Sequence, residues 1–188
     1  MPSILYAGAA CPEVDWDKGE SPDTHSLPKK RTRILLADDH ASFRKSLKIL
    51  VESNGRIEVV GQARNGLEAV RMAGDLRPEV VVMDMAMPLL NGLEATRQMM
   101  RAFPATRVLI LSAHPDPEYI KQAMTFGASG YLIKQSSTHV LGEAVRESVR
   151  GNCYFSSSLP KDLRDEMRMV FAKAEVLRKK RAARHTPG

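Results

Sequence analysis

The sequence predicts an α/β fold in which helices cover both faces of a parallel sheet. Apolar runs of strand length recur through the middle of the chain, and they are short and rich in Val, Ile and Leu, as buried parallel strands are. Segments with helical spacing separate these runs, and strands that alternate with helices indicate βαβ units. The five runs are residues 34–37, 57–60, 80–83, 108–111 and 130–133.

Helical spacing is clearest after the first two runs, in Phe43, Leu47, Leu50 and Val51 and in Leu67, Val70, Met72 and Ala73. Five strand–helix repeats fill residues 33–150, which is the size of a flavodoxin-like, doubly wound domain with a five-stranded parallel sheet. Residues 1–32 have scattered prolines and no periodic pattern, so we expect them to form a disordered leader.

One additional helix is expected over residues 159–184, within a basic extension that covers residues 158–188. Pro160 fits the first turn of a helix, and an apolar stripe follows at alternating spacings of four and three residues. The stripe is Leu163, Met167, Val170, Ala174 and Leu177. Three roles for this helix remain open: packing on its own domain, contact with a second copy or a partner helix, or binding of nucleic acid or an anionic surface by its basic end.

The bulk composition excludes several classes of protein. With 188 residues, 43% hydrophobic and 27% charged, the chain has room for one ordinary globular domain and its extensions. No apolar run approaches the roughly 20 residues needed to cross a bilayer. Cys11 and Cys153 are too few for a disulfide framework or a zinc cage, so a cytoplasmic location is expected. The net charge of +6 lies mostly in residues 153–188 and describes this appendage more than the domain.

Polar side chains stand where the predicted strands end. Asp38 and Asp39 follow the first strand, Asp84 the third, Ser112 the fourth and Lys134 the fifth. In a doubly wound fold the carboxyl ends of the strands line the ligand crevice. Four strands therefore deliver three carboxylates, a hydroxyl and an ammonium to one edge of the sheet, although each of these residues alone would more often be a cap, a strand end or a solvated loop residue.

Three carboxylates that lie close together repel one another, so this cluster is expected to hold a hard divalent cation. Oxygen ligands and an incomplete protein shell suit Mg²⁺, which retains waters and accepts phosphate oxygens. A carboxylate beside Mg²⁺ can act as the nucleophile in phosphoryl transfer. Lys134 would then pair with one phosphoryl oxygen, and Ser112 would donate a hydrogen bond to another. Neither His40 nor His114 has a second ligand set around it, so no transition-metal site is expected.

Five ordered motifs resemble the receiver domain of bacterial response regulators. The motifs are LADDH at 36–40, ARNGLEA at 63–69, MDMAMP at 83–88 with NGLEA at 91–95, LSAH at 111–114 and GASGYLIK at 127–134. The likeness covers residues 33–157 and is greatest for the NarL/FixJ subfamily, including the stretch GNCYFS at 151–156. The resemblance implies a two-component phosphorelay in which a sensor histidine kinase or a phosphotransfer protein donates the phosphoryl group.

Carried over by position, the resemblance assigns the phosphoryl group to Asp84. It implies that Asp39, Asp84 and the carbonyl of Ala86 bind Mg²⁺, and that Asp38 acts partly through water. Such a protein catalyses only its own phosphorylation and a slow dephosphorylation, so it is a switch and not an enzyme in the ordinary sense.

The same resemblance names the parts of the switch. Ser112 is the hydroxyl that moves towards the phosphoryl group, Lys134 is the lysine that pairs with it, and Tyr131 is the aromatic residue that turns inward on activation. Gln135 is a mild departure, because many family members have a proline after the lysine. The face formed by the fourth helix, the fifth strand and the fifth helix is then expected to contact a downstream protein target, or a second copy in a homodimer.

The region after the receiver departs more strongly from the subfamily. Members of the subfamily usually carry a helix-turn-helix domain there. Only 31 residues follow Ser157, without a two-helix pattern, so we expect a receiver that stands alone or a shortened chain. One alternative is a DNA-associated transcriptional regulator that acts through the basic C-terminal tail. Another is a scaffold that does not depend on phosphorylation, but the complete set of site residues argues against it.

Overall fold

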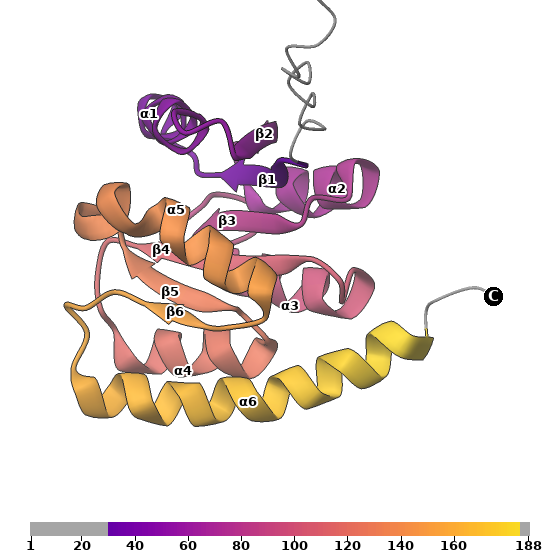
Figure 1. Cartoon of the computed structure of the whole chain (residues 1–188), viewed down its shortest axis with the longest axis vertical. Coiled ribbons are helices and arrows are strands. Elements are labelled where there is room, and N and C mark those ends of the chain that lie inside the picture. Colours follow the sequence, from indigo (N-terminus) through magenta and orange to yellow (C-terminus); the bar gives the residue numbers. More distant parts are fainter. Residues whose placement is uncertain (1–29, 185–188) are drawn as a thin grey trace, which may run out of the picture.

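The computed structural model describes residues 30–184, and the side chains of residues 30–180 (Figure 1). The predicted leader, residues 1–32, lies almost entirely outside this range, and its last residue, Thr32, already begins the first strand. The elements are β1 (Thr32–Ala37), α1 (Ala41–Glu52), β2 (Ile57–Ala63), α2 (Gly66–Leu76), β3 (Val80–Asp84), α3 (Gly92–Ala102), β4 (Arg107–Ser112), α4 (Pro117–Phe126), β5 (Gly130–Ile133), α5 (Lys134–Arg150), β6 (Tyr154–Phe155) and α6 (Lys161–Arg184).

The strands form one parallel sheet in the order β2-β1-β3-β4-β5-β6. The chain therefore runs first to one side of β1 and then to the other, which is the doubly wound topology that the sequence predicts. Successive side chains along β1 point to opposite faces of the sheet. Leu35 and Ala37 pack with α2, α3 and α4, whereas Ile34 and Leu36 pack with α1 and α5.

The sheet has a sixth strand, so the prediction of five strands was wrong at this edge. In β6, Tyr154 pairs with Gly130 and Phe155 pairs with Tyr131. A strand of two residues is too short to show an alternating pattern in the sequence, and it forms because the main chain returns beside the open edge of β5. No Cβ fits at Gly130, because it would lie 2.3 Å from the carbonyl oxygen of Tyr154.

Helix α6 confirms the expected C-terminal helix, and it packs alongside α4 (Figure 1). The predicted apolar stripe was partly wrong. Met167 is buried as expected, but Leu177 is 59% exposed, and the buried positions one and two turns beyond Met167 are Phe171 and Glu175. The helix turns this face inward because Met167 and Phe171 pack in the core and Glu175 forms an ion pair with Arg107 of β4. Apolar periodicity cannot reveal the ion pair.

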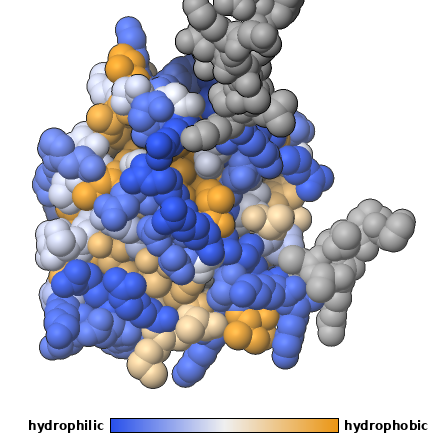
Figure 2. All heavy atoms as spheres, in the orientation of Figure 1, coloured by the Kyte–Doolittle hydropathy of each residue, from blue (hydrophilic) through white to orange (hydrophobic). Residues whose placement is uncertain are grey.

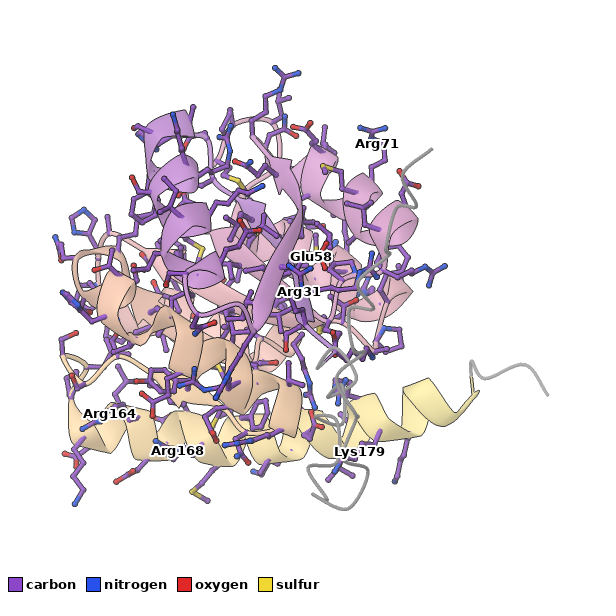
Figure 3. All side chains as sticks on the ribbon, turned by 45° about the horizontal axis from the view of Figure 1, so that its top comes forward. Arg31, Glu58, Arg71, Arg164, Arg168 and Lys179 are labelled. Carbon is purple, nitrogen blue, oxygen red and sulfur yellow. The ribbon has the colours of Figure 1, made fainter. Side chains whose placement is uncertain are left out.

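The outward side of α6 is mixed in character. Exposed apolar side chains, namely Met169, Val176 and Leu177, interrupt a polar surface along the helix (Figure 2). Arg164, Arg168 and Lys179 are spaced along the same helix (Figure 3). Within residues 30–184, no helix is both long enough and apolar enough to span a bilayer.

Candidate functional site

The predicted site residues at the ends of β1, β3 and β5 come together at the carboxyl edge of the sheet. Asp38 and Asp84 are each only 2% exposed, and the ammonium of Lys134 lies between them. Lys134 Nζ is 2.8 Å from Asp38 Oδ2 and 3.0 Å from Asp84 Oδ2. The ring of Phe43 on α1 lies 5.1 Å from the same ammonium and favours its position. One cation thus balances two buried carboxylates.

The approach to Asp84 depends on a close contact of the backbone. Asp84 ends β3, and the chain turns back so that the amide of Gly92 donates a hydrogen bond to the carbonyl of Met85 at 3.0 Å. A Cβ at Gly92 would lie 2.0 Å from the carbonyl oxygen of Asp84, so only glycine fits here. Asn91 then caps α3, because its side chain accepts a hydrogen bond from the amide of Glu94.

The acidic cluster fits a divalent cation. Asp38, Asp39, His40 and Asp84 each offer one ligand atom, and these atoms all lie within 4.8 Å of one another. Asp38 Oδ2 and Asp84 Oδ2 are buried and receive no hydrogen bond within the described residues, apart from their ion pairs with Lys134. Carboxylate oxygens that contact a single ammonium still have lone pairs that can bind a hard cation such as Mg²⁺.

The electrostatics of the site favour a bound cation. Burial raises the pKa of Asp84, Lys134 counteracts this rise, and Asp38 adds to it, so the pKa lies above the ordinary value of aspartate. Burial acts to lower the pKa of Lys134, but its hydrogen bonds to Asp38 and Asp84 outweigh burial and raise it. Lys134 therefore stays charged, and an added cation would stabilise the ionised form of Asp84.

Ser112 and Tyr131 are linked through a shared acceptor, and among the hydrogen bonds of the described residues neither side chain bonds to Asp84. Ser112 Oγ donates a hydrogen bond to the carbonyl of His114 at 2.9 Å, and the hydroxyl of Tyr131 donates to the same carbonyl at 3.2 Å. Tyr131 is fully buried, so its ring is turned inward. Burial raises its pKa, which keeps the phenol protonated as a donor. The two predicted switch residues thus share one acceptor.

Two residues near the site were missed by the sequence reasoning. His40, which was given no role, lies with Nδ1 2.8 Å from Asp39 Oδ1 and 3.4 Å from Asp38 Oδ1. Its position directly after two aspartates was the available signal. Ser156 of the turn after β6 accepts a hydrogen bond from the amide of Ile133, immediately before Lys134. No sequence signal links Ser156 to the site, because the contact depends on the pairing of β6.

That the carbonyl of Ala86 binds Mg²⁺ stays a prediction. The amide of Ala86 lies 3.4 Å from Asp84 Oδ1, which brings this part of the backbone beside the carboxylate.

Comparison with known proteins decides the family. The family model described as the response regulator receiver domain matches residues 34–146. The chain belongs to the response regulator receiver family. Among curated relatives, the receiver is 34% identical over 142 residues to the transcriptional regulatory protein DegU of Brevibacillus brevis, covering 76% of this chain and 60% of DegU. It is 35% identical over 135 residues to the oxygen regulatory protein NreC of Staphylococcus carnosus, covering 71% of this chain and 62% of NreC.

Solved structures show the same receiver fold. The signal receiver domain of the putative response regulator NarL from Mycobacterium tuberculosis matches with a TM-score of 0.62 and 31% identity, covering 65% of this chain and 99% of that one. The response regulator domain of Thermotoga maritima CheB matches with a TM-score of 0.61 and 32% identity, covering 64% of this chain and 98% of that one. The chain spans about 60% of the length of the curated relatives named above.

Proposed function

We propose that this receiver accepts a phosphoryl group on Asp84, with the assistance of Mg²⁺, and thereby switches its protein contacts in a two-component phosphorelay. The observation that carries the proposal is the pair of ionic contacts that Lys134 makes with Asp38 and Asp84, at 2.8 and 3.0 Å, in a buried edge of a parallel sheet. A carboxylate beside a fixed cation, at the edge where the strands end, is suited to phosphoryl transfer.

In the reaction, an oxygen of Asp84 attacks the phosphorus of the donor and forms an acyl phosphate. The bond from phosphorus to the donor breaks, and the leaving group is the imidazole of a kinase or phosphotransfer histidine, or acetate from a small donor. Lys134 neutralises charge that develops on the phosphoryl oxygens, and it needs no large movement because it already contacts Asp84.

Asp39, Asp84 and the carbonyl of Ala86 are proposed to hold the cation, with Asp38 acting through water. Mg²⁺, when bound, supplies positive charge to the phosphoryl oxygens and offsets the repulsion between the carboxylates. His40 holds the carboxylate of Asp39 in place through the 2.8 Å contact.

The switch is proposed to begin at Ser112. Its hydroxyl donates to the carbonyl of His114, so it has to turn away from this carbonyl to donate to a phosphoryl oxygen. The hydroxyl of Tyr131 continues to donate to that carbonyl. The two-state element is therefore a hydroxyl with two alternative acceptors.

The face expected to contact a downstream target is partly covered by other elements of the same chain. The side of the domain formed by α4 and β5 is covered by α6 and β6 of the same chain. A target or a second copy in a homodimer therefore meets these added elements, or replaces them. In the nucleic-acid alternative, Arg178 is one of the basic residues that would bind. Its side chain instead donates to Glu175 and to the carbonyl of Pro104 within the protein. A cytoplasmic location, where kinases of this class donate, completes the proposal.

Intact-mass spectrometry after incubation with acetyl phosphate tests this function. The wild type is expected to gain one phosphoryl group in the presence of Mg²⁺ and none when the metal is chelated. The variant Asp84→Asn is expected to lose the adduct completely, because an amide is not a nucleophile for phosphorus. Asp75→Asn, on the exposed surface of α2, is the matched control and should be modified like the wild type. An adduct that persists in Asp84→Asn would contradict the proposal.

A further inference from the structure

The C-terminal segment, defined here as residues 154–180, occupies the side of the receiver formed by α4 and β5. We propose that this segment is an intramolecular ligand of the α4–β5 face, and that its docking is coupled to the state of Asp84 through Ser156 and Tyr131. The coupling rests on the proposed function, because phosphorylation is the event that it transmits. Docking itself, and its effect on Tyr131, do not depend on that function.

The segment covers the α4–β5 face with apolar side chains. Residues 154–155 extend the sheet beside β5, and α6 lies along α4 (Figure 1). The guanidinium of Arg168 on α6 lies 5.7 Å from the ring centroid of Phe155, so α6 also contacts β6. The buried side chains that the segment adds to the cluster containing Tyr131, Ile120 and Met124 are Phe155, Leu159, Met167 and Phe171.

A buried ionic cluster holds the far part of α6 in place. Glu175 is 8% exposed, and its carboxylate pairs with Arg107 at 2.6 and 3.0 Å and with Arg178 at 2.8 and 2.8 Å. Burial acts to raise the pKa of Glu175, but the two arginines outweigh burial and hold this pKa at about 2. Arg178 also donates to the carbonyl of Pro104 at 2.7 Å. A buried carboxylate is tolerated only where its charge is paired. The pairing of Glu175 with two arginines therefore indicates one specific docked position of α6.

One chain of contacts joins the docked segment to the phosphoacceptor Asp84, and a second joins it to the switch hydroxyl of Ser112. The first runs from Asp84 to Lys134, whose preceding residue Ile133 donates its amide to Ser156 Oγ at 2.9 Å. The second starts at Tyr131, whose carbonyl accepts a hydrogen bond from the amide of Ser156 at 3.1 Å. Both chains therefore end on Ser156, the residue that directly follows β6.

The second chain continues from Tyr131 to the switch hydroxyl. The phenol of Tyr131 and the hydroxyl of Ser112 both donate to the carbonyl of His114. When the hydroxyl of Ser112 turns away from the carbonyl of His114, that carbonyl keeps a hydrogen-bond donor only if the ring of Tyr131 stays inward. The docked segment packs against the same apolar cluster and pairs with the backbone of Tyr131, so it favours the inward ring.

Docking and phosphorylation are therefore expected to favour each other. A docked segment lowers the cost of moving Ser112, because the carbonyl of His114 keeps a donor. By thermodynamic reciprocity, a phosphoryl group at Asp84 tightens docking by the same factor, and such couplings are typically about 5- to 150-fold. The α4–β5 face of the phosphorylated receiver is then closed to other partners, and α6 becomes part of the surface that a target contacts.

Hydrogen exchange measured by mass spectrometry on the full chain tests the coupling. The probe is beryllofluoride with Mg²⁺, a mimic of the phosphoryl group, applied to the wild type, Glu175→Gln and the matched control Glu166→Gln. Glu166 lies on the same helix, and its 3.5 Å contact with Lys121 of α4 joins two side chains that are more than half exposed, so its loss should affect docking little. In the wild type and the control, the probe should slow exchange of the α6 amides by about fivefold or more. In Glu175→Gln without the probe, exchange should be faster both in α6 and in residues 130–134.

The outcomes separate this proposal from the proposed function. Protection around Asp84 by the probe with no change in α6 overturns the coupling and leaves the phosphoacceptor function intact. Absence of protection around Asp84 overturns the proposed function. The coupling of docking to Tyr131 is then judged by Glu175→Gln alone, and unchanged exchange in residues 130–134 overturns it. A dimer in which two copies exchange the segment, detected by sedimentation, would overturn the intramolecular assignment.

Discussion

Replacing Lys134 with methionine is expected to reduce the rate of phosphoryl transfer to Asp84 by about 100-fold or more, because one preorganised charge is removed from the site of bond formation. The side-chain length is nearly kept, so the loss follows from the charge. Acetyl phosphate, Mg²⁺ and timed intact-mass measurements give the rate. Lys173→Met, at an exposed position on α6, is the control and should react at the wild-type rate.

The same variant makes a prediction for stability against pH. Without Lys134, only the weaker effect of the backbone hydrogen bond from Ala86 counteracts burial and Asp38, so the pKa of Asp84 rises further above its ordinary value. A carboxyl group whose pKa is raised in the folded state stabilises the fold at low pH, and this contribution is lost as the pH rises through the raised pKa. Lys134→Met in the absence of metal should therefore be less destabilised at pH 5 than at pH 8. Equal destabilisation at both values, or transfer at the wild-type rate, would contradict the role given to Lys134.

Gly92→Ala is expected to destabilise the receiver by about 3 kcal/mol and to abolish phosphorylation of the fraction that folds. A Cβ at this position would lie 2.0 Å from the carbonyl oxygen of Asp84 and 2.9 Å from its carbonyl carbon. Both are backbone atoms, so relief of the clash has to move the main chain that carries the phosphoacceptor. Urea unfolding gives the free energy, and intact mass gives the phosphorylation.

Gly142→Ala is the matched control for this substitution. Gly142 lies inside α5, and outside the helix backbone an added Cβ would meet only Nη1 of Arg146, at 3.7 Å, among the described residues. Alanine is favoured over glycine inside a helix by about 1 kcal/mol, so this variant should be more stable and fully active. If Gly92→Ala unfolds at the same urea concentration as the wild type, the close approach of α3 to Asp84 is not as described.

The sequence was sufficient for the main part of the fold and for the juxtaposition of three residues of the candidate site. Five strands were predictable because each is an apolar run of several residues, and the carboxyl ends of parallel strands share one edge. Asp38, Asp84 and Lys134 were therefore expected together, and the structure places Lys134 Nζ 2.8 Å from Asp38 Oδ2 and 3.0 Å from Asp84 Oδ2. The comparison with known receivers confirms the family that the motifs resemble.

The remaining features depend on contacts between distant parts of the chain. The face that α6 buries includes Met167 and Phe171, but it also includes Glu175, whose pairing with Arg107, 68 residues away, leaves no trace in the apolar periodicity of the helix. The role of Ser112 toward a phosphoryl group stays a prediction, and the contact that its hydroxyl makes in the structure is a local one, with the carbonyl of His114 two residues away. The strand β6 was missed because two residues show no period.

The central claim is that Asp84 itself carries the phosphoryl group. The direct test is to treat the phosphorylated wild-type protein with borohydride, which reduces an aspartyl phosphate to homoserine, and to map the modified residue by peptide mass spectrometry. We expect homoserine at position 84, in the peptide that contains the end of β3, and unmodified aspartate at positions 38 and 39. Homoserine at either of those two positions, or a phosphorylated protein with Asp84 unchanged, would contradict the account.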